Sequence, residues 1–384
     1  MHEKIRTTYM DYYRPDYDNC LVNFSNSLLK VFGAETNAPT LKSADKLLEK
    51  DYKNVVVLLM DAMGISILEK HLEPDGFLRS HLEASYSSVF PPTTVAATTS
   101  ILSGLYPNES GWLGWDMYFP ELDKNVTVFL NKEQLTEDEN GELKEPAPAA
   151  DFHAGFKYCP YKNIIERINE AGGSAYASMP FLEPFPQDLE AILSRVEELC
   201  KQPEKKFIYA YWNEPDGTMH LKGPDSNDTR ELMISLENRL EKFASGLTDT
   251  LLLITADHSQ VECENYCLMD YPEILKCLVR MPAIEPRALA FWVKDEYKKV
   301  FPDIFRNAFG DKFWILTGDE VIESKLFGIG KDHKQLRDMI GDYLAVSVSS
   351  AAVFLTHKEA EMMPGGHAGL TKEELEIPLI AVTC

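Results

Sequence analysis

Three short apolar runs in the sequence are each followed by aspartate or histidine residues, which are side chains of the kinds that can bind metal ions. Carboxylates and imidazoles are the ligands that zinc and similar divalent ions take in proteins. A further histidine, His367, lies in the glycine-rich segment PGGHAGLTKEE. An aspartate after a strand is also a common helix N-cap, and a lone histidine is more often a surface residue, so only the shared position after the runs favours a metal cluster. The six candidate ligands are enough for two metal sites: Asp61, Asp216, His220, Asp257, His258 and His367.

The stretch VFPPTTVAATTSILSGLYP, residues 89–107, crowds hydroxyl side chains behind two prolines. It is typical of a helix start, with Thr93 or Thr94 in the first turn. Backbone N–H groups at a helix N-terminus favour anions such as phosphate. A threonine hydroxyl bound to a metal ion there can ionise and act as a nucleophile. The alternative is a simple capping threonine, and we interpret the hydroxyls of residues 98–100 as helix packing.

Buried strands have to bring these residues together. The run Asn54–Met60 is short, continuous and rich in β-branched residues, which is typical of a buried strand. Helix-like stretches separate the runs, so we predict an α/β fold with a mostly parallel central sheet and helices on both faces. The carboxyl ends of parallel strands lie along one edge, where the three aspartates should converge. The expected strands are Asn54–Met60, Gly173–Ser178, Lys206–Trp212, Thr250–Ala256, Ala288–Val293 and Ile377–Thr383.

Two regions break the alternation of strands and helices. Residues near 120–156 are polar, acidic and punctuated by proline and glycine, so we expect a loop insertion there. Residues 271–350 have mixed patterning, and we expect them to form a cap inserted into the fold. Residues 1–270 and 351–384 then form the catalytic core.

The chain of 384 residues has 38 basic and 61 acidic side chains, a net charge of −23. Such a surface repels phosphate backbones, so we expect no nucleic-acid polymer as partner, whereas metal ions in a cleft still allow a small phosphorylated substrate. Seven scattered cysteines match neither a disulfide framework nor a zinc finger. The chain shows no signal core and no membrane-spanning run, so we expect a cytoplasmic protein, monomer or homodimer, without a membrane partner.

The ordered motifs resemble the alkaline phosphatase superfamily, and within it the type I phosphodiesterase/nucleotide pyrophosphatase branch. The matching segments are VVVLLMDAMG, PPTTVAATTSILSGLYP, EPDGTMHLKGPDS, ITADHS and GGHAGLTKEELEIPLI. The resemblance implies an alkaline phosphatase-like core in which Thr94 is the nucleophile of a phosphodiesterase. It also implies two divalent metal ions, Zn²⁺ or Mn²⁺. Asp61, Asp257, His258 and the Thr94 oxygen would bind one ion, and Asp216, His220 and His367 the other.

The sequence departs from the family pattern at the nucleophile. The branch often reads Thr-Phe-Pro-Asn there, whereas this chain reads TVAA, with Val95 and Ala97 in place of the aromatic and the asparagine. Nucleotide specificity therefore stays open. Alternatives on the same core are a phosphomonoesterase or phosphonate hydrolase, and, from another class, a non-catalytic metal-stabilised binding protein. Candidate substrate-binding residues are Thr93, Trp112, Trp115 and Tyr118, although aromatic residues of this kind are more often core.

Overall fold

Six strands form the central sheet of the computed structural model, which describes residues 13–138 and 140–384. β8, β9, β1 and β10 run parallel, whereas β19 is antiparallel to β10 and to β2. All residues of β1 and β10 are buried, as expected for strands that are covered on both faces. In sheet order the strands are β2 (Leu82–Ser87), β19 (Glu376–Thr383), β10 (Thr250–Thr255), β1 (Asn54–Met60), β9 (Lys206–Trp212) and β8 (Ala175–Ser178).

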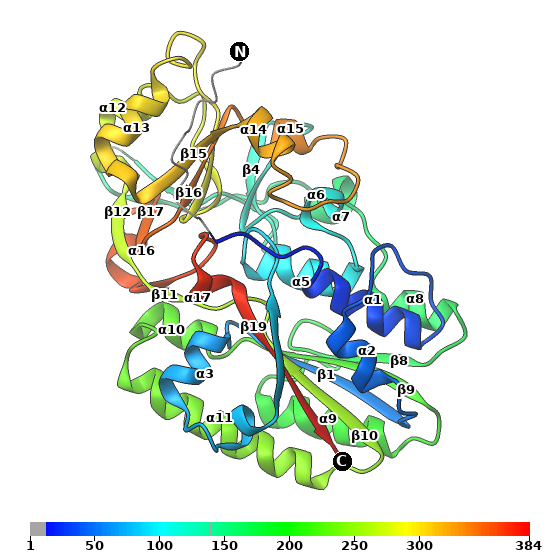
Figure 1. Ribbon diagram of the computed structural model, residues 1–384. Helices are drawn as coiled ribbons and strands as arrows, with labels where there is room; N and C mark the ends of the chain where they lie inside the picture. The colour runs from blue at the N-terminus through cyan, green and yellow to red at the C-terminus, as the bar shows by residue number, and fades with distance from the viewer. Residues whose placement is uncertain (1–12, 139) are drawn as a thin grey trace, which may run out of the picture.

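Helices cover both faces of this sheet (Figure 1). One face carries α1 (Leu21–Val31), α2 (Lys42–Leu48), α5 (Thr94–Ser103) and α8 (Ile164–Glu170). The other carries α3 (Ile65–His71), α4 (Phe77–Ser80), α9 (Leu189–Lys201) and α11 (Asn227–Gly246). In α11 the buried apolar residues recur every three or four positions, at Met233, Leu236, Leu240 and Phe243, which gives the helix one apolar stripe. The predicted α/β fold with a mostly parallel central sheet is confirmed.

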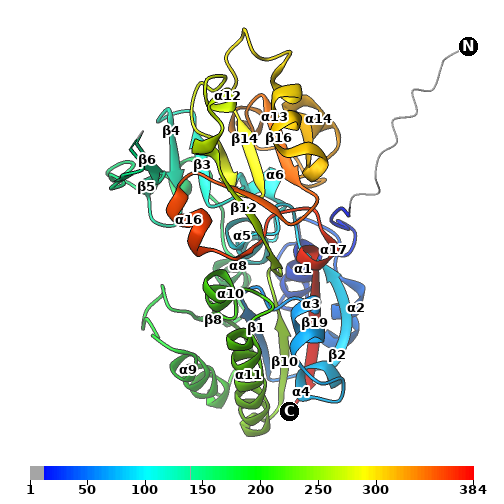
Figure 2. The ribbon, with the colours of Figure 1, turned by 90° about the vertical axis from the view of Figure 1, so that its left-hand side faces the viewer.

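A second sheet of seven antiparallel strands lies beyond the carboxyl edge of the central sheet, with α5 between them (Figure 2). This sheet contains strands from the predicted loop insertion and from the predicted cap. The expected boundaries between core and cap stay a prediction. In order the strands are β15 (Phe313–Thr317), β16 (Tyr343–Ser347), β14 (Ala288–Phe291), β13 (Ala283–Glu285), β3 (Asp116–Phe119), β4 (Lys124–Thr127) and β5 (Lys132–Glu133). Its helices include α12 (Pro272–Leu275), α13 (Phe301–Phe309), α14 (Gly318–Glu323) and α15 (Leu336–Met339).

The strand expected at Ala288–Val293 exists, but its assignment to the parallel sheet was wrong. Only Pro286 and Arg287 separate β13 from β14, and Glu285 pairs with Ala288. Two strands joined by two residues form an antiparallel hairpin, because a parallel pair needs a long crossover connection. β14 therefore belongs to the seven-stranded sheet.

Short strand pairs and helices link the two large sheets. β11 (Val261–Glu262) pairs with β18 (Gly365–Gly366), and β12 (Glu264–Cys267) with β17 (Ala351–Phe354). A separate hairpin consists of β6 (Thr136–Glu137) and β7 (Leu143–Lys144). The remaining helices are α6 (Pro107–Ser110), α7 (Ala154–Tyr158), α10 (Asp216–Lys222), α16 (His357–Met362), α17 (Lys372–Leu375) and the short 3₁₀ turns Leu268–Asp270 and Gly310–Lys312.

A buried ion pair joins the β13–β14 turn to α17. Both Arg287 and Glu374 are almost fully buried, and the guanidinium donates to both carboxylate oxygens at 2.8 Å. Arg287 also donates to the carbonyl oxygens of Ser349 and Ala351. Glu374 accepts a further bond from the N–H of Gly369, two residues after His367. The pair thus fixes the second sheet against the segment that carries His367.

None of the helices within residues 13–138 and 140–384 has both the length and the apolar character needed to cross a bilayer.

Candidate active site

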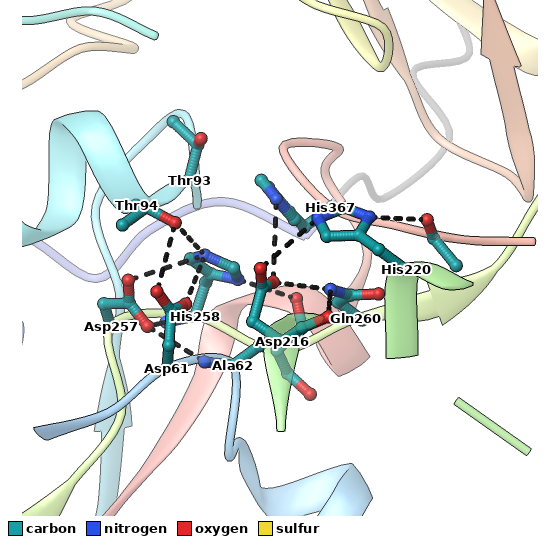
Figure 3. A network of polar contacts seen from close by, with 12 residues as sticks. Asp61, Ala62, Thr93, Thr94, Asp216, His220, Asp257, His258, Gln260 and His367 are labelled. Carbon is teal, nitrogen blue, oxygen red and sulfur yellow. Dashed lines mark hydrogen bonds and ion pairs between the residues drawn. The ribbon is translucent and has the colours of Figure 1, made fainter. Parts of the chain in front are cut away.

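The candidate nucleophile lies at the first position of α5. Thr93 is the N-cap, in extended backbone, and Thr94 is the first helical residue, as the sequence predicts. The helix ends at Gly104, whose φ of 71° is the left-handed conformation that glycine adopts without strain. The hydroxyl oxygen of Thr94 lies 3.3 Å from His258 Nε2 and 3.5 Å from Asp61 Oδ2 (Figure 3).

Asp61, Asp257 and His258 form a buried group beside this hydroxyl. Asp61 follows β1 and the other two follow β10, and their candidate ligand atoms lie within 4.8 Å of one another. His258 Nε2 is 3.4 Å from Asp61 Oδ1 and 3.5 Å from Asp257 Oδ2. Both of these carboxylate oxygens are buried and accept no hydrogen bond from the described residues. Two carboxylate oxygens and one imidazole nitrogen therefore converge on one point, and their lone pairs are available to a metal ion.

Hydrogen bonds behind the group hold the ligand atoms in place. Asp257 Oδ1 accepts bonds from the N–H of Ala62, 3.1 Å, and from the N–H of His258, 3.0 Å. Ala62 has a φ of 59°, a strained value for an alanine, directly after Asp61. His258 Nδ1 faces the carbonyl oxygen of Ser259 at 3.1 Å, so the proton belongs on Nδ1 and the lone pair on Nε2 points into the group.

A second group lies beside the first and shares His258 with it. The candidate ligand atoms of Asp216, His258 and His367 are within 4.8 Å of one another. His220 meets the other oxygen of Asp216, with Nε2 and Oδ2 3.5 Å apart, and its Nδ1 faces the carbonyl oxygen of Gly365 at 3.0 Å. His367 Nδ1 is buried and has no hydrogen-bond partner among the described residues. The structure thus brings all six candidate ligands and Thr94 together (Figure 3).

The charges of the site fit divalent cations. Burial, followed by the carboxylates of Asp257 and Asp216, raises the pKa of Asp61 well above its usual value. Burial lowers the pKa of His367 far below its usual value, and neighbouring His258 and His220 lower it further. Buried carboxylates without a counter-ion are unfavourable, and neutral imidazole is the form that binds metal. Two divalent cations would stabilise the ionised carboxylates, and the donor set of nitrogen and oxygen atoms suits zinc or manganese.

A scan against protein-family models matches residues 55–300, more than half of the chain, to the type I phosphodiesterase/nucleotide pyrophosphatase model. The chain belongs to the type I phosphodiesterase/nucleotide pyrophosphatase family. Members of this family are hydrolases that act on phosphoester bonds. The motifs named from the sequence, with Asp61, Thr94, Asp216 and Asp257, lie within the matched residues.

Curated relatives of the family match about half of this chain. Human ectonucleotide pyrophosphatase/phosphodiesterase family member 1 is 24% identical over 191 residues, which are 47% of this chain and 20% of the relative. Mouse family member 3 is 23% identical over 210 residues, 51% of this chain and 23% of the relative. The match therefore spans less than a quarter of the length of either curated relative.

Solved structures share the fold at low sequence identity. Murine ectonucleotide pyrophosphatase/phosphodiesterase 5, an inactive form in complex with AMP, has a TM-score of 0.64 at 16% identity. That likeness covers 87% of this chain and 88% of the murine chain. Phosphonoacetate hydrolase from Sinorhizobium meliloti 1021, in complex with phosphonoformate, has a TM-score of 0.58 at 13% identity and covers 85% of this chain and 89% of its own. At these identities the likeness concerns the fold.

The positions where this family member departs from the motif are buried. Val95 and Ala97 are both 0% exposed, Val95 within the core of the second sheet. Neither side chain therefore presents a surface to a ligand in this structure.

The candidate substrate-binding aromatic residues lie in different surroundings. Trp112 is buried, and its indole N–H donates to the carbonyl oxygen of Cys159. Trp115 is 42% exposed and lines a cavity of about 70 Å³ with Asp116, Gln134 and Glu285. Tyr118 packs under the guanidinium of Arg280, 4.1 Å from its ring centroid. Trp115 therefore combines an exposed ring with a place in the lining of a cavity.

Three residues that the sequence interpretation did not single out support the site. The Tyr211 hydroxyl donates to Asp61 Oδ2, and the Gln260 side-chain N–H donates to Asp216 Oδ1 at 2.5 Å. Glu285 accepts bonds from the Thr93 hydroxyl, 2.6 Å, and the N–H of Trp115, 2.8 Å. Tyr211 lies near the end of β9, and Gln260 lies two residues after His258. A position near a strand end was the one sequence signal for either residue. Glu285 had none.

The Thr93–Glu285 hydrogen bond leaves the first turn of α5 without a side-chain cap. Thr93 makes no capping bond to the helix: its side chain is directed to Glu285, to which the hydroxyl donates, and its oxygen accepts no N–H of the first turn. Burial is the main cause that raises the pKa of Glu285 to about 8. The N–H groups of the first turn, which a capping side chain would otherwise occupy, can therefore face an anion in front of Thr94.

Proposed function

We propose that this protein is a metal-dependent phosphohydrolase of the phosphodiesterase type, with Thr94 as the nucleophile. The observation that carries the proposal is the position of the Thr94 hydroxyl. It lies at an uncapped helix N-terminus and 3.3 Å from His258 Nε2, in front of two buried carboxylate oxygens that accept no hydrogen bond from the described residues. Such an arrangement combines a nucleophile, an anion site and ligands for divalent cations.

The proposed cofactors are two divalent metal ions, Zn²⁺ or Mn²⁺. Asp61, Asp257 and His258, with the Thr94 oxygen, would hold one ion, and Asp216, His220 and His367 the other. Two ions at such a site lower the pKa of a bound hydroxyl or water and offset the charge of the phosphoryl oxygens. The first set is supported by the ligand atoms of Asp61, Asp257 and His258 within 4.8 Å of one another, and the second by the nearness of His367 to Asp216 and by His220 Nε2, 3.5 Å from Asp216 Oδ2. The Nδ1 atoms of His258 and His220 face carbonyl oxygens, which leaves Nε2 for a metal ion.

Thr94 would act by displacement at phosphorus. The hydroxyl loses its proton to solvent, and its oxygen attacks along the line of the ester bond. The bond from phosphorus to the leaving oxygen breaks, that oxygen takes up a proton, and a phospho-threonine forms. A water molecule then attacks the same phosphorus, the bond to Thr94 breaks, and the hydroxyl regains a proton. The N–H of Thr94 is positioned to donate to a phosphoryl oxygen during both steps, because α5 begins at this residue.

The seven-stranded sheet is proposed to act as a cap that selects a small phosphorylated substrate. The exposed ring of Trp115 and its cavity support a contact there, with Tyr118 further along the same sheet. The net charge of −23 supports a small substrate over a nucleic-acid polymer. A cytoplasmic location, supported by seven free cysteines, and a monomeric or homodimeric state are also proposals.

The proposal is tested by a paired assay on metal-analysed protein. Bis(p-nitrophenyl) phosphate and p-nitrophenyl phosphate are compared with and without chelator, for the wild type, Thr94→Ala and Thr98→Ala. Thr98 is a matched control, since it lies one turn further along α5 and donates to the Thr94 carbonyl oxygen. We expect faster, chelator-sensitive diester cleavage that is lost in Thr94→Ala and kept in Thr98→Ala.

Each other outcome points to a different function. Preference for the monoester would indicate a phosphomonoesterase. A phosphonate is assayed beside the two esters, and its cleavage alone would indicate a phosphonate hydrolase. Equal activity in Thr94→Ala, at matched metal content, would exclude this threonine as nucleophile. Two bound metal ions without turnover of any of these substrates would favour the non-catalytic binding protein.

A further inference from the structure

Three potential ligands from distant parts of the chain meet outside the candidate active site. They are Glu137 at the end of β6, Cys267 at the end of β12 and His357 at the start of α16. One ligand atom from each, a carboxylate oxygen, a thiol sulfur and an imidazole nitrogen, lies within 4.8 Å of the others. None of the three belongs to the two groups around Thr94. We propose that Glu137, Cys267 and His357 bind a further divalent metal ion, of the zinc type, at a structural site.

The arrangement of His357 is that of a metal ligand with its supporting hydrogen bond. Its Nε2 faces Asp270 Oδ1 at 3.2 Å, while its Nδ1 contacts Glu137 Oε1. A carboxylate on one ring nitrogen holds the proton there and leaves the lone pair of the other nitrogen for a metal ion. Asp270 therefore orients the ring and Nδ1 faces the proposed ion.

Glu137 is a buried carboxylate that needs a positive partner. The residue is only 5% exposed, and its second oxygen, Oε2, accepts the backbone N–H of His357 at 2.9 Å. Oε1 contacts the imidazole Nδ1, and the hydrogen bonds of the ring to Asp270 and Glu137 raise its pKa, so that a proton lies between Nδ1 and Oε1. A divalent cation in place of that proton would give the buried carboxylate a permanent counter-charge.

Cys267 sets the kind of metal. The residue is 5% exposed, and burial is the main cause that raises the pKa of its thiol to about 11. A buried thiol of this kind is protonated and unreactive unless a metal ion takes the place of the proton. A thiolate, an imidazole and a carboxylate together suit Zn²⁺ and not Mg²⁺ or Ca²⁺, which bind through oxygen.

The protons and charges of the binding step balance. The metal ion displaces the thiol proton of Cys267 and the proton between His357 Nδ1 and Glu137 Oε1, and both go to solvent. The ligands then carry two negative charges, one on the thiolate and one on the carboxylate, against the two positive charges of the ion. A fourth position is left for water.

The site would link three segments of the chain, of which β12 and α16 are also joined by Asn265, whose side-chain amide donates to the carbonyl oxygens of Ala360 and Met363. The β6–β7 hairpin forms a two-stranded sheet of its own beside β5, the end strand of the seven-stranded sheet, and it contacts α16 through Glu137 and His357 (Figure 2). α16 leads into the loop and short strand β18 that precede His367. A metal ion bound here would therefore hold the hairpin against the segment that carries an active-site histidine, without contacting the substrate.

The experiment uses cobalt as a spectroscopic probe of the full-length protein. Resident metals are removed with chelator and Co²⁺ is added to the wild type, Cys267→Ala and Cys277→Ala. The active-site groups contain no cysteine, so a thiolate-to-cobalt charge-transfer band in the near ultraviolet reports the proposed site alone. Cys277 is the matched control, because it is buried in the same part of the molecule and its thiol donates to the Glu273 carbonyl oxygen.

We expect the band in the wild type and in Cys277→Ala. In Cys267→Ala the band should be lost, and the protein should bind one metal ion fewer per chain. A band that persists in Cys267→Ala, or cobalt-loaded wild type without any band, would overturn the proposal. Because Cys267→Ala can disturb packing, Asp270→Asn provides a second test at an exposed residue. It should keep the band but weaken the cobalt affinity on the order of tenfold or more; an unchanged affinity would contradict the proposed role of Asp270 in orienting His357.

Discussion

At the scale of single residues, the site depends on side chains that donate hydrogen bonds to the proposed metal ligands. Tyr211 is the clearest case, since its buried hydroxyl donates to Asp61 Oδ2. Burial raises the pKa of this hydroxyl well above its usual value, so it stays protonated and remains a donor. The bond favours the ionised form of Asp61, which is the form that can bind a metal ion.

We therefore expect Tyr211→Phe to weaken metal binding and hydrolysis by roughly 10- to 100-fold, as for other losses of a hydrogen bond to a metal ligand. Metal-buffered titrations of activity and of bound zinc measure the effect. Tyr209→Phe is the matched control, because the Tyr209 hydroxyl is buried on the same strand and bonds to none of the described residues. Equal losses in the two variants would mean that packing, and not the bond to Asp61, is responsible.

Glu285 gives a pH dependence whose sign is fixed by its burial. The pKa of its carboxyl is raised to about 8, so between about pH 4.5 and 8 the folded protein holds a proton that the unfolded chain has lost. This contribution to the free energy of unfolding is present at low pH and is lost as the pH rises through about 8. Glu285→Gln keeps a neutral side chain that still accepts a hydrogen bond.

The free energy of unfolding of Glu285→Gln, relative to the wild type, should therefore increase from about pH 5 to about pH 9 in urea titrations. Glu264→Gln is the control, and its difference should stay flat over this range. The exposed carboxyl of Glu264 bonds to Lys312, which lowers its pKa, so it titrates at lower pH than the range tested. A Glu285→Gln difference that stays flat over this range would contradict a protonated Glu285.

At the scale of elements, the strands that carry the site could be predicted because each is a short, predominantly apolar run. β1 and β9 have the bounds expected from the sequence, and β10 differs by one residue. A run that is buried on both faces leaves no choice of side for its side chains, and the metal-binding residues follow it directly. These runs therefore predict that Asp61 and Asp257 lie at one edge of the sheet, as they do in the structure.

Elements whose position depends on distant partners could not be predicted in the same way. β14 is an apolar run like the others, yet a two-residue turn places it in the antiparallel sheet. Glu285 approaches Thr93 across 192 positions of sequence, and no local pattern marks that contact. The same is true of Glu137, Cys267 and His357, whose nearness follows from the packing of three short elements. Local patterns define elements, while contacts between elements require the full fold.

At the scale of the whole molecule, the ion pair of Arg287 and Glu374 connects the seven-stranded sheet to the segment that leads into β19 of the central sheet. Each partner is buried, so removal of one leaves an uncompensated charge in the interior. We expect Arg287→Met to lower the free energy of unfolding by roughly 3–5 kcal/mol. The double variant with Glu374→Gln should lose less than the sum of the two single changes, because it removes both charges.

Urea unfolding of the two single variants and the double variant measures this coupling. Arg306→Met is a suitable control, since Arg306 forms an ion pair with Asp303 on the exposed side of α13. That change should alter stability by about 0.5 kcal/mol or less. Additive losses for Arg287 and Glu374 would show that the two residues act separately.

The position of β19 also sets the order in which the molecule can be completed on the ribosome. β19 follows every other strand in the chain, yet it lies between β10 and β2 in the central sheet. While the nascent chain is still growing, the exposed flank of β10 and the unpaired β2 have no strand between them. Such open edges are where unfinished chains aggregate, so the central sheet is protected from edge-to-edge pairing only after residues 376–383 have inserted between β10 and β2.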